Sequence, residues 1–95
     1  MELEWDAAKN EQNVRKHGFD FADAAACFRS PLLVREDARR DYGEQRWVGL
    51  GRIQDMVVNP VFTRRGHRIR VISLRRANSR ERELYFQYLR SGQSN

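Results

Sequence analysis

Residues 63–76 constrain the fold more than any other part of this sequence, because they combine a core strand with a row of arginines. The middle of the stretch, from Ile69 to Leu74, is β-branched and apolar, as in a buried strand. Strand alternation predicts two faces. One face takes Ile69, Val71, Ser73 and Arg75, and the other takes Arg68, Arg70, Ile72, Leu74 and Arg76. The pattern indicates either a sheet whose rim binds an anionic ligand or a core strand with solvated ends.

Three segments upstream also predict strands, at residues 32–36, 45–52 and 56–63. In the second of them, alternation places Trp47 on one face with Gly49 and Gly51. Pro60 lies inside the third. Because proline cannot donate to a strand ladder, we expect this strand to be at an edge of the sheet or bulged at that point.

Three helices are predicted, each with a signal at its start. The first covers residues 7–17, with Asp6 as the N-cap and Gly18 as the left-handed residue after its end. Asp20 opens the second helix. Its apolar stripe is formed by Phe21, Ala24, Ala25 and Phe28. The third begins after Asn78, and Glu81 has the spacing of a capping box.

A short first strand at residues 3–5 completes the predicted elements. Helices followed by consecutive strands and a closing helix predict an α+β fold, with a single antiparallel β-sheet packed on the N-terminal helices and a C-terminal helix. A length of 95 residues fits one domain, which we expect at residues 1–90 with a frayed tail at residues 91–95.

The charge is divided unevenly along the chain. Residues 1–45 hold seven Lys or Arg against ten Asp or Glu, a net charge of −3, whereas residues 46–95 hold eleven against three, a net charge of +8. Sixteen of the 18 basic residues are arginine, which favours planar contacts with phosphate or carboxylate. Nucleic acid is therefore the leading class of partner, although a GC-rich coding bias also enriches arginine.

Targeting signals are not evident in the sequence. The N-terminal residues lack the basic start and apolar block of a secretory signal, and the apolar runs are too short to span a membrane. Cys27 is the only cysteine, so an internal disulfide is impossible, which fits a reducing compartment. We therefore expect a cytoplasmic protein.

Motifs for nucleotide hydrolysis or zinc binding are missing from the sequence, so we expect neither a metal nor a cofactor. RNA cleavage needs neither, because the 2′-hydroxyl of the substrate is the nucleophile and the protein supplies a base, an acid and cations. His17 is the first candidate acid or base, with His67 second, although a histidine at a helix end also serves the helix dipole alone.

Cationic and aromatic side chains supply the remaining candidates. Arg65, Arg68, Arg70, Arg75 and Arg76 are candidates to bind the scissile phosphate and stabilise its transition state. In the polar loop at residues 37–44, Asp41, Tyr42 and Glu44 offer a base or a hydrogen bond. Trp47 either stacks on a base or packs against the protein.

Several segments in a fixed order resemble the BrnT family of toxins from bacterial type II toxin–antitoxin pairs. They run from Glu4 to Tyr85 and comprise Glu4-Trp5-Asp6, Lys9-Asn10, Lys16-His17-Gly18, Asp41-Tyr42-Gly43-Glu44, Arg46-Trp47, Gly51-Arg52, Val61-Phe62-Thr63, Arg65-Gly66, Ile69-Arg70-Val71-Ile72-Ser73 and Arg75-Arg76-Ala77. Two positions depart from the family pattern. Arg64 stands where relatives most often have glutamate, and Asn59-Pro60 interrupts a strand that is usually apolar throughout.

The resemblance implies a RelE-like fold, RNA cleavage that inhibits translation, and neutralisation by a BrnA-like ribbon-helix-helix antitoxin, through which the complex binds operator DNA. The catalytic residues that it implies are His17, Arg65, Arg70 and Arg75. The RNA-binding residues that we expect around them are Lys16, Arg64, Arg68, Arg76 and Trp47. Two alternatives stay open: a non-catalytic nucleic-acid-binding module or corepressor, and an interaction protein whose basic face receives an acidic antitoxin segment.

Overall fold

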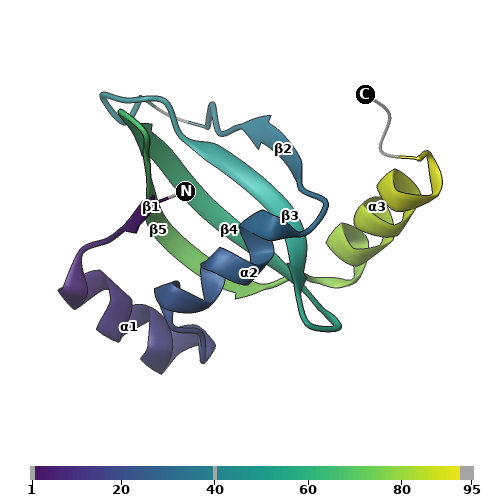
Figure 1. The fold of residues 1–95 in the computed structure, drawn as a ribbon, viewed down its shortest axis with the longest axis horizontal. Helices are drawn as coiled ribbons and strands as arrows, with labels where there is room; N and C mark the ends of the chain where they lie inside the picture. Colours follow the sequence, from purple (N-terminus) through teal and green to yellow (C-terminus); the bar gives the residue numbers. More distant parts are fainter. Residues whose placement is uncertain (1, 40, 93–95) are drawn as a thin grey trace.

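A computed structural model describes residues 2–39 and 41–92 of the chain (Figure 1). Along the sequence, its elements are β1 (Glu2–Glu4), α1 (Ala7–His17), the 3₁₀ turn η1 (Phe21–Asp23), α2 (Ala24–Arg29), β2 (Leu33–Glu36), β3 (Trp47–Ile53), β4 (Met56–Arg65), β5 (Arg68–Arg76) and α3 (Ser79–Arg90). The frayed tail predicted at residues 91–95 lies largely outside the described residues, which end at residue 92.

The strands form one five-stranded sheet in the order β1-β5-β4-β3-β2. The pairs from β2 to β5 are antiparallel, whereas β1 runs parallel to β5. The predicted α+β class, the single sheet and the placement of helices before and after it are confirmed. The sheet is mixed rather than antiparallel throughout, because β1 and β5 begin at the same end of the sheet, where Glu2 pairs with Arg68.

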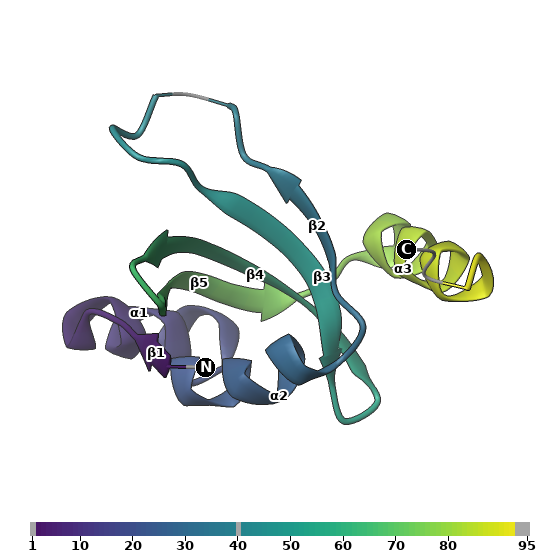
Figure 2. The ribbon, with the colours of Figure 1, turned by 45° about the horizontal axis from the view of Figure 1, so that its top comes forward.

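Helices pack on both faces of the sheet. On one face, Phe21, Ala24 and Cys27 pack with Val58 and other strand residues, and on the opposite face Tyr85 of α3 packs with Val57 and Leu50. Because Val57 and Val58 are neighbours in β4, their side chains point to opposite faces. We call these the α2 face and the α3 face. Figure 2 shows α2 along the sheet and α3 beyond one end of it.

The predicted helix ends agree with the structure. Asp6 accepts a hydrogen bond from the backbone N–H of Ala8 at 2.9 Å, and Gly18 adopts a φ of 79° while its N–H donates to the Val14 carbonyl. Asn78 and Glu81 form the predicted capping box at the start of α3. The second helix differs slightly, because Asp20 caps the 3₁₀ turn η1 before α2 begins.

Close packing of α2 on β3 requires a glycine. A Cβ atom at Gly51 would lie 2.6 Å from Cys27 Sγ and 2.9 Å from Ser30 Oγ. The predicted shared face of Trp47, Gly49 and Gly51 is therefore the α2 face, where the glycines let the helix approach the strand.

Pro60 lies in the interior of the sheet, since β4 is paired with both β3 and β5. The prediction of an edge position was therefore wrong. The predicted bulge occurs one residue further on, where Val61 pairs with Ser73 but Phe62 pairs with Val71, so that Ile72 is an extra residue in β5.

This bulge corrects the two faces predicted for the arginine-rich strand. Strict alternation would place Arg75 with Val71 and Leu74 with Arg70. Instead Leu74 is buried with Val71 in the α2-face core, and Arg75 lies opposite Asn59 on the α3 face. Arg70 lies opposite Thr63, and Arg68 opposite Arg65, on that same face. The bulge therefore brings Arg68, Arg70 and Arg75 to one side of the sheet.

Candidate functional site

Three predicted catalytic arginines lie on the α3 face, and each is bound to a carboxylate of the same chain. Arg65 Nη2 lies 3.2 Å from Glu44 Oε1, and Arg70 Nη1 lies 2.9 Å from Glu4 Oε2. Arg75 makes a two-point contact with Glu81, at 2.9 and 2.8 Å. The arrangement therefore holds the guanidinium groups in defined positions, with their charge balanced inside the protein.

The first group of these charges lies at the end of the sheet where β1 pairs with β5. The parallel register places Glu2 opposite Arg68 and Glu4 opposite Arg70. Arg68 Nε donates to Glu2 at 3.0 Å. The hydrogen bond from Arg70, strengthened by the nearby charges of Arg68 and Arg65, holds the pKa of Glu4 below its usual value. This end of the α3 face is a connected network of charges.

The second group surrounds Glu81 at the start of α3. Its carboxylate accepts from Arg75, from Asn59 Nδ2 at 3.3 Å and from the backbone N–H of Asn78 at 2.9 Å. The Arg75 contact is the main reason why the pKa of Glu81 is lowered. A hollow of about 210 Å³ opens beside it, lined also by Arg35. Arg75 is thus tied to α3 through a carboxylate that occupies both donors of its fork.

Asn13 attaches α1 to the edge of β5 at this end. Beyond the short β1, the Asn13 side chain takes the place of a neighbouring strand: Nδ2 donates to the Leu74 carbonyl at 2.8 Å, and Oδ1 accepts from the Leu74 N–H at 3.1 Å. Asn13 is buried. Asn13 was not among the predicted site residues, because its only local signal is a polar side chain facing inward on a weakly apolar helix. Its effect is to hold the C-terminus of α1 beside the strand that carries Arg75.

His17 is the last residue of α1 and is half-buried. Burial lowers the pKa of its imidazole, and the positive charges of Lys16 and Arg75 lower it further. These effects favour the neutral form of the His17 imidazole. A neutral imidazole near an arginine suits a general base better than a general acid.

The α3-face arginines do not form a single cluster. Arg70 lies opposite Thr63 and Arg75 opposite Asn59, so the two arginines are four positions of β4 apart, a separation of roughly 13 Å along the strand. Lys16 and Arg75 both act electrostatically on His17, whereas the charges of Arg65, Arg68 and Arg70 all act on Glu4. His67, the second histidine candidate, is exposed in the turn between β4 and β5.

Other predicted RNA-binding residues lie on the α2 face. Arg76 lines a shallow surface hollow beside the turn between β3 and β4. Trp47 and Arg64 line a larger groove of about 460 Å³. The predicted set is therefore divided between two faces of the sheet, because alternation along β3 and β4 turns these side chains away from Arg75.

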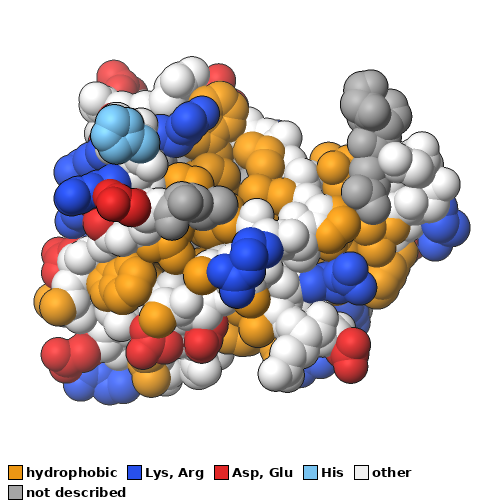
Figure 3. Space-filling model, viewed as in Figure 1, with side chains coloured by type: hydrophobic (Ala, Val, Ile, Leu, Met, Phe, Trp, Pro, Cys, Tyr) orange, Lys and Arg blue, Asp and Glu red, His pale blue; other side chains and the backbone are white. Residues whose placement is uncertain are grey.

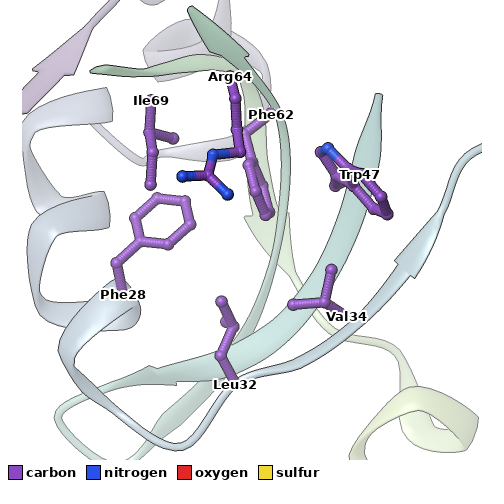
Figure 4. Close-up of a pocket in the computed structure, with 7 residues that line it drawn as sticks. All are labelled: Phe28, Leu32, Val34, Trp47, Phe62, Arg64 and Ile69. Atoms are coloured by element: carbon purple, nitrogen blue, oxygen red, sulfur yellow. The ribbon is translucent and has the colours of Figure 1, made fainter. Parts of the chain in front are cut away.

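The groove that contains Trp47 and Arg64 is otherwise apolar. Its remaining lining residues are Phe28, Leu32, Val34, Phe62 and Ile69. The Phe28 and Phe62 rings meet edge to face, with 4.9 Å between centroids, and the Arg64 guanidinium points in among these side chains (Figure 4). Figure 3 shows hydrophobic side chains gathered between α2 and β2 on this side of the molecule. We call this the α2-face groove.

The loop between β2 and β3 contains one buried carboxylate. Asp37 accepts two hydrogen bonds from the Arg39 side chain, at 2.7 and 2.9 Å, and one from the Tyr42 hydroxyl at 3.3 Å. The Arg39 guanidinium lowers the pKa of Asp37 to about 2. Of the loop candidates, Tyr42 thus supports Asp37, and Glu44 binds Arg65. These contacts give the loop a structural role.

Comparison with known proteins identifies one family. The family model described as "Ribonuclease toxin, BrnT, of type II toxin-antitoxin system" matches residues 5–81. No curated protein matches the chain. Among the described residues, no helix is long and apolar enough to cross a membrane, and no group of His, Cys, Asp or Glu side chains is placed to hold a metal ion.

Proposed function

The chain belongs to the BrnT family of ribonuclease toxins from type II toxin–antitoxin systems, and from this premise we propose that it is an endoribonuclease that cleaves RNA without a metal ion, with His17 and Arg75 at the centre of its site. The observation that carries this proposal is the fixed position of α1 on β5. Asn13 bonds Leu74 twice, so His17 and Arg75 are held at the same end of the sheet.

The proposed reaction is an attack by the RNA on itself. His17, neutral because its pKa is lowered, accepts the proton of a 2′-hydroxyl. The 2′ oxygen then bonds to the adjacent phosphorus, and the bond from phosphorus to the 5′ oxygen breaks. The leaving oxygen takes a proton from water, and His17 releases its proton to solvent. Arg75 stabilises the additional negative charge on the phosphoryl oxygens in the transition state.

Substrate binding then requires an exchange of anions on Arg75. In the free protein, the Glu81 carboxylate accepts from both Nη1 and Nη2 of Arg75. A phosphate offers the same two-point geometry as a carboxylate, so it can replace Glu81 without moving the arginine. Arg70, roughly 13 Å from Arg75 along β5, is proposed to bind a neighbouring phosphate of the RNA by the same exchange, as are Arg65 and Arg68 beside it.

The family also implies an antitoxin partner, and the finer features of the system are part of the proposal. They are a RelE-like fold, arrest of translation in the cytoplasm, a BrnA-like antitoxin with a ribbon-helix-helix part, and binding of operator DNA only through that antitoxin. The basic second half of the chain supports RNA as the substrate, since eleven of its charged residues are basic and three are acidic.

The test is RNA cleavage by the purified protein in EDTA. We expect His17→Ala and Arg75→Ala each to reduce the cleavage rate by about 100-fold or more, by comparison with the loss of a single oxyanion donor. Arg90→Ala, which removes an exposed arginine from the end of α3, is the matched control and should cleave normally. An inactive wild-type protein, or full activity in both site variants, would contradict the assignment.

Binding without cleavage is the second candidate function, and it is favoured by the ion pairs themselves. Arg65, Arg70 and Arg75 each bind a carboxylate in the free protein. An RNA phosphate can replace that carboxylate whether or not a cleavage reaction follows. This alternative predicts RNA affinity that falls steeply with salt, and RNA that stays intact throughout the incubation.

A further inference from the structure

The outer edge of β2 is open along one side of the sheet. β2 is the terminal strand, and its only strand neighbour within residues 2–39 and 41–92 is β3. The Asp37 N–H donates to the Arg46 carbonyl at 2.8 Å, in register with the pairing of β2 and β3. Because bonded and non-bonded pairs alternate in antiparallel strands, Val34 and Glu36 direct their N–H and C=O groups away from β3. This edge is therefore able to pair with another strand.

A cavity flanks this edge on each face of the sheet. On one side is the α2-face groove of about 460 Å³, and on the other is the hollow of about 210 Å³ between β2 and α3, which we call the α3-face hollow. Val34 lines both and is 41% exposed, and Leu84, in the α3-face hollow, is 47% exposed. An added strand would direct alternate side chains into the two cavities.

Each cavity also contains an arginine outside the ion pairs of the described residues. Arg64 points into the α2-face groove (Figure 4). Arg35 lines the α3-face hollow together with Glu81, whose carboxylate is bound to Arg75. Within the described part of the chain, neither forms an ion pair, in contrast to Arg65, Arg68, Arg70 and Arg75. A second copy of this chain, with its net charge of +5, would bring like charges together at this edge. An acidic partner is complementary to it.

From these observations we propose that the outer edge of β2 binds an extended segment of the protein antitoxin by strand addition. The segment places apolar side chains in the two cavities and carboxylates beside Arg64 and Arg35. This inference rests on the proposed function only for the identity of the partner, because a toxin of this class is paired with an antitoxin protein. The proposed catalytic residues His17 and Arg75 take no part in it.

A proline substitution tests the strand addition directly. Val34→Pro removes an N–H that points away from β3, so the existing ladder keeps its bonds. Val34→Thr has a similar shape, retains the N–H and is the matched control. The probe is the antitoxin encoded beside this gene, titrated calorimetrically against each variant. We expect the proline to weaken binding by about 10-fold or more, and the threonine to change it by less than about 3-fold.

Charge reversal supplies an independent test that does not depend on how well the proline variant folds. We expect Arg64→Glu and Arg35→Glu each to weaken antitoxin binding by about 10-fold, because they oppose carboxylates of the bound segment. Arg90→Glu, at an exposed residue of α3 that lines neither cavity, carries the same charge change as a control. Thermal unfolding of every variant establishes that the fold is retained.

Four results would overturn the proposal. The first is that the wild-type chain does not bind the antitoxin. The second is that Val34→Pro and both charge variants bind the antitoxin as tightly as the wild type. The third is that the wild-type chain is a dimer that Val34→Pro dissociates, and the fourth is that Trp47→Ala loses RNA affinity while its antitoxin binding is unchanged. RNA cleavage by the free wild-type chain is measured in parallel. Its absence would reject the nuclease alone, because the effect of Val34→Pro on antitoxin binding is read separately.

Discussion

Asn13 and Leu74 are joined by two hydrogen bonds, at 2.8 and 3.1 Å, although 61 residues separate them in the sequence. The side chain of a helical residue thereby pairs with the edge of a strand. This contact fixes the end of α1 relative to β5, and the relation between His17 and Arg75 depends on it.

Removing the Asn13 carboxamide should therefore affect both stability and activity. Asn13→Leu leaves the N–H and C=O of Leu74 buried without partners, and we expect the free energy of unfolding to fall by about 2 to 4 kcal/mol. Urea unfolding measures the loss, with Gln12→Leu, on the exposed side of the same helix, as control. Cleavage measured well below the denaturation midpoint should fall as well. A loss of stability no larger than in the control would show that the two bonds contribute little.

The imidazole of His17 should respond to its neighbouring charge. Burial, Lys16 and Arg75 lower its pKa, so replacing Lys16 by glutamine should raise it. NMR titration of the imidazole in a His67→Gln background measures this shift directly. If His17 is the base, the acid limb of the cleavage profile moves to higher pH in Lys16→Gln by the same amount. A pH profile that stays fixed while the titration moves would assign the base to another group.

Glu81 should restrain RNA binding by occupying Arg75. We expect Glu81→Gln to bind RNA about 3- to 10-fold more tightly, because the neutral amide competes less well for the guanidinium. The same variant should lose about 1 kcal/mol of stability, since a partly exposed ion pair contributes little. Glu83→Gln makes an identical change of net charge on the exposed face of α3. Equal tightening in both variants would mean that net charge, rather than release of Arg75, is responsible.

Acid should destabilise the protein through the carboxylates that it holds ionised. The folded-state pKa of Asp37 is about 2, below its unfolded value, so the unfolded chain binds more protons in acid. The stability from this group is complete above the unfolded pKa and is lost as pH falls toward 2. Asp37→Asn should flatten the decline in urea midpoint between pH 4 and pH 2, whereas the exposed Asp55→Asn should preserve it. An unchanged slope in Asp37→Asn would contradict this role.

The parts of the fold that depend on neighbouring residues could be predicted from the sequence. Asp6 and Gly18 bound α1 as expected, and the capping box of Asn78 and Glu81 begins α3. These features need only a few consecutive residues, so the signal is local. The glycines of β3 were also correctly grouped with Trp47 on one face by alternation alone.

The features that escaped prediction depend on contacts between distant residues. A bulge was expected near Pro60 of β4, but its effect on β5, where Ile72 becomes the extra residue, arises from the register between the two strands. Likewise, the α2-face groove is lined by residues that are distant in the sequence, from Phe28 to Ile69. The carboxylates that bind Arg65, Arg70 and Arg75 come from the loop before β3, from β1 and from α3. Nothing local in the sequence distinguishes an arginine that is paired in this way from a solvated one.

The extra residue in β5 has a consequence for how this strand tolerates change. If Ile72 took a regular place in the ladder instead, strict alternation would resume, and Leu74 and Arg75 would exchange sides. An aliphatic side chain would then meet Glu81, and a guanidinium would enter the apolar interior. The chemistry of the strand thus depends on the register of its pairing as much as on the identity of its residues, and a slip of a single position would disable it although no arginine had been replaced.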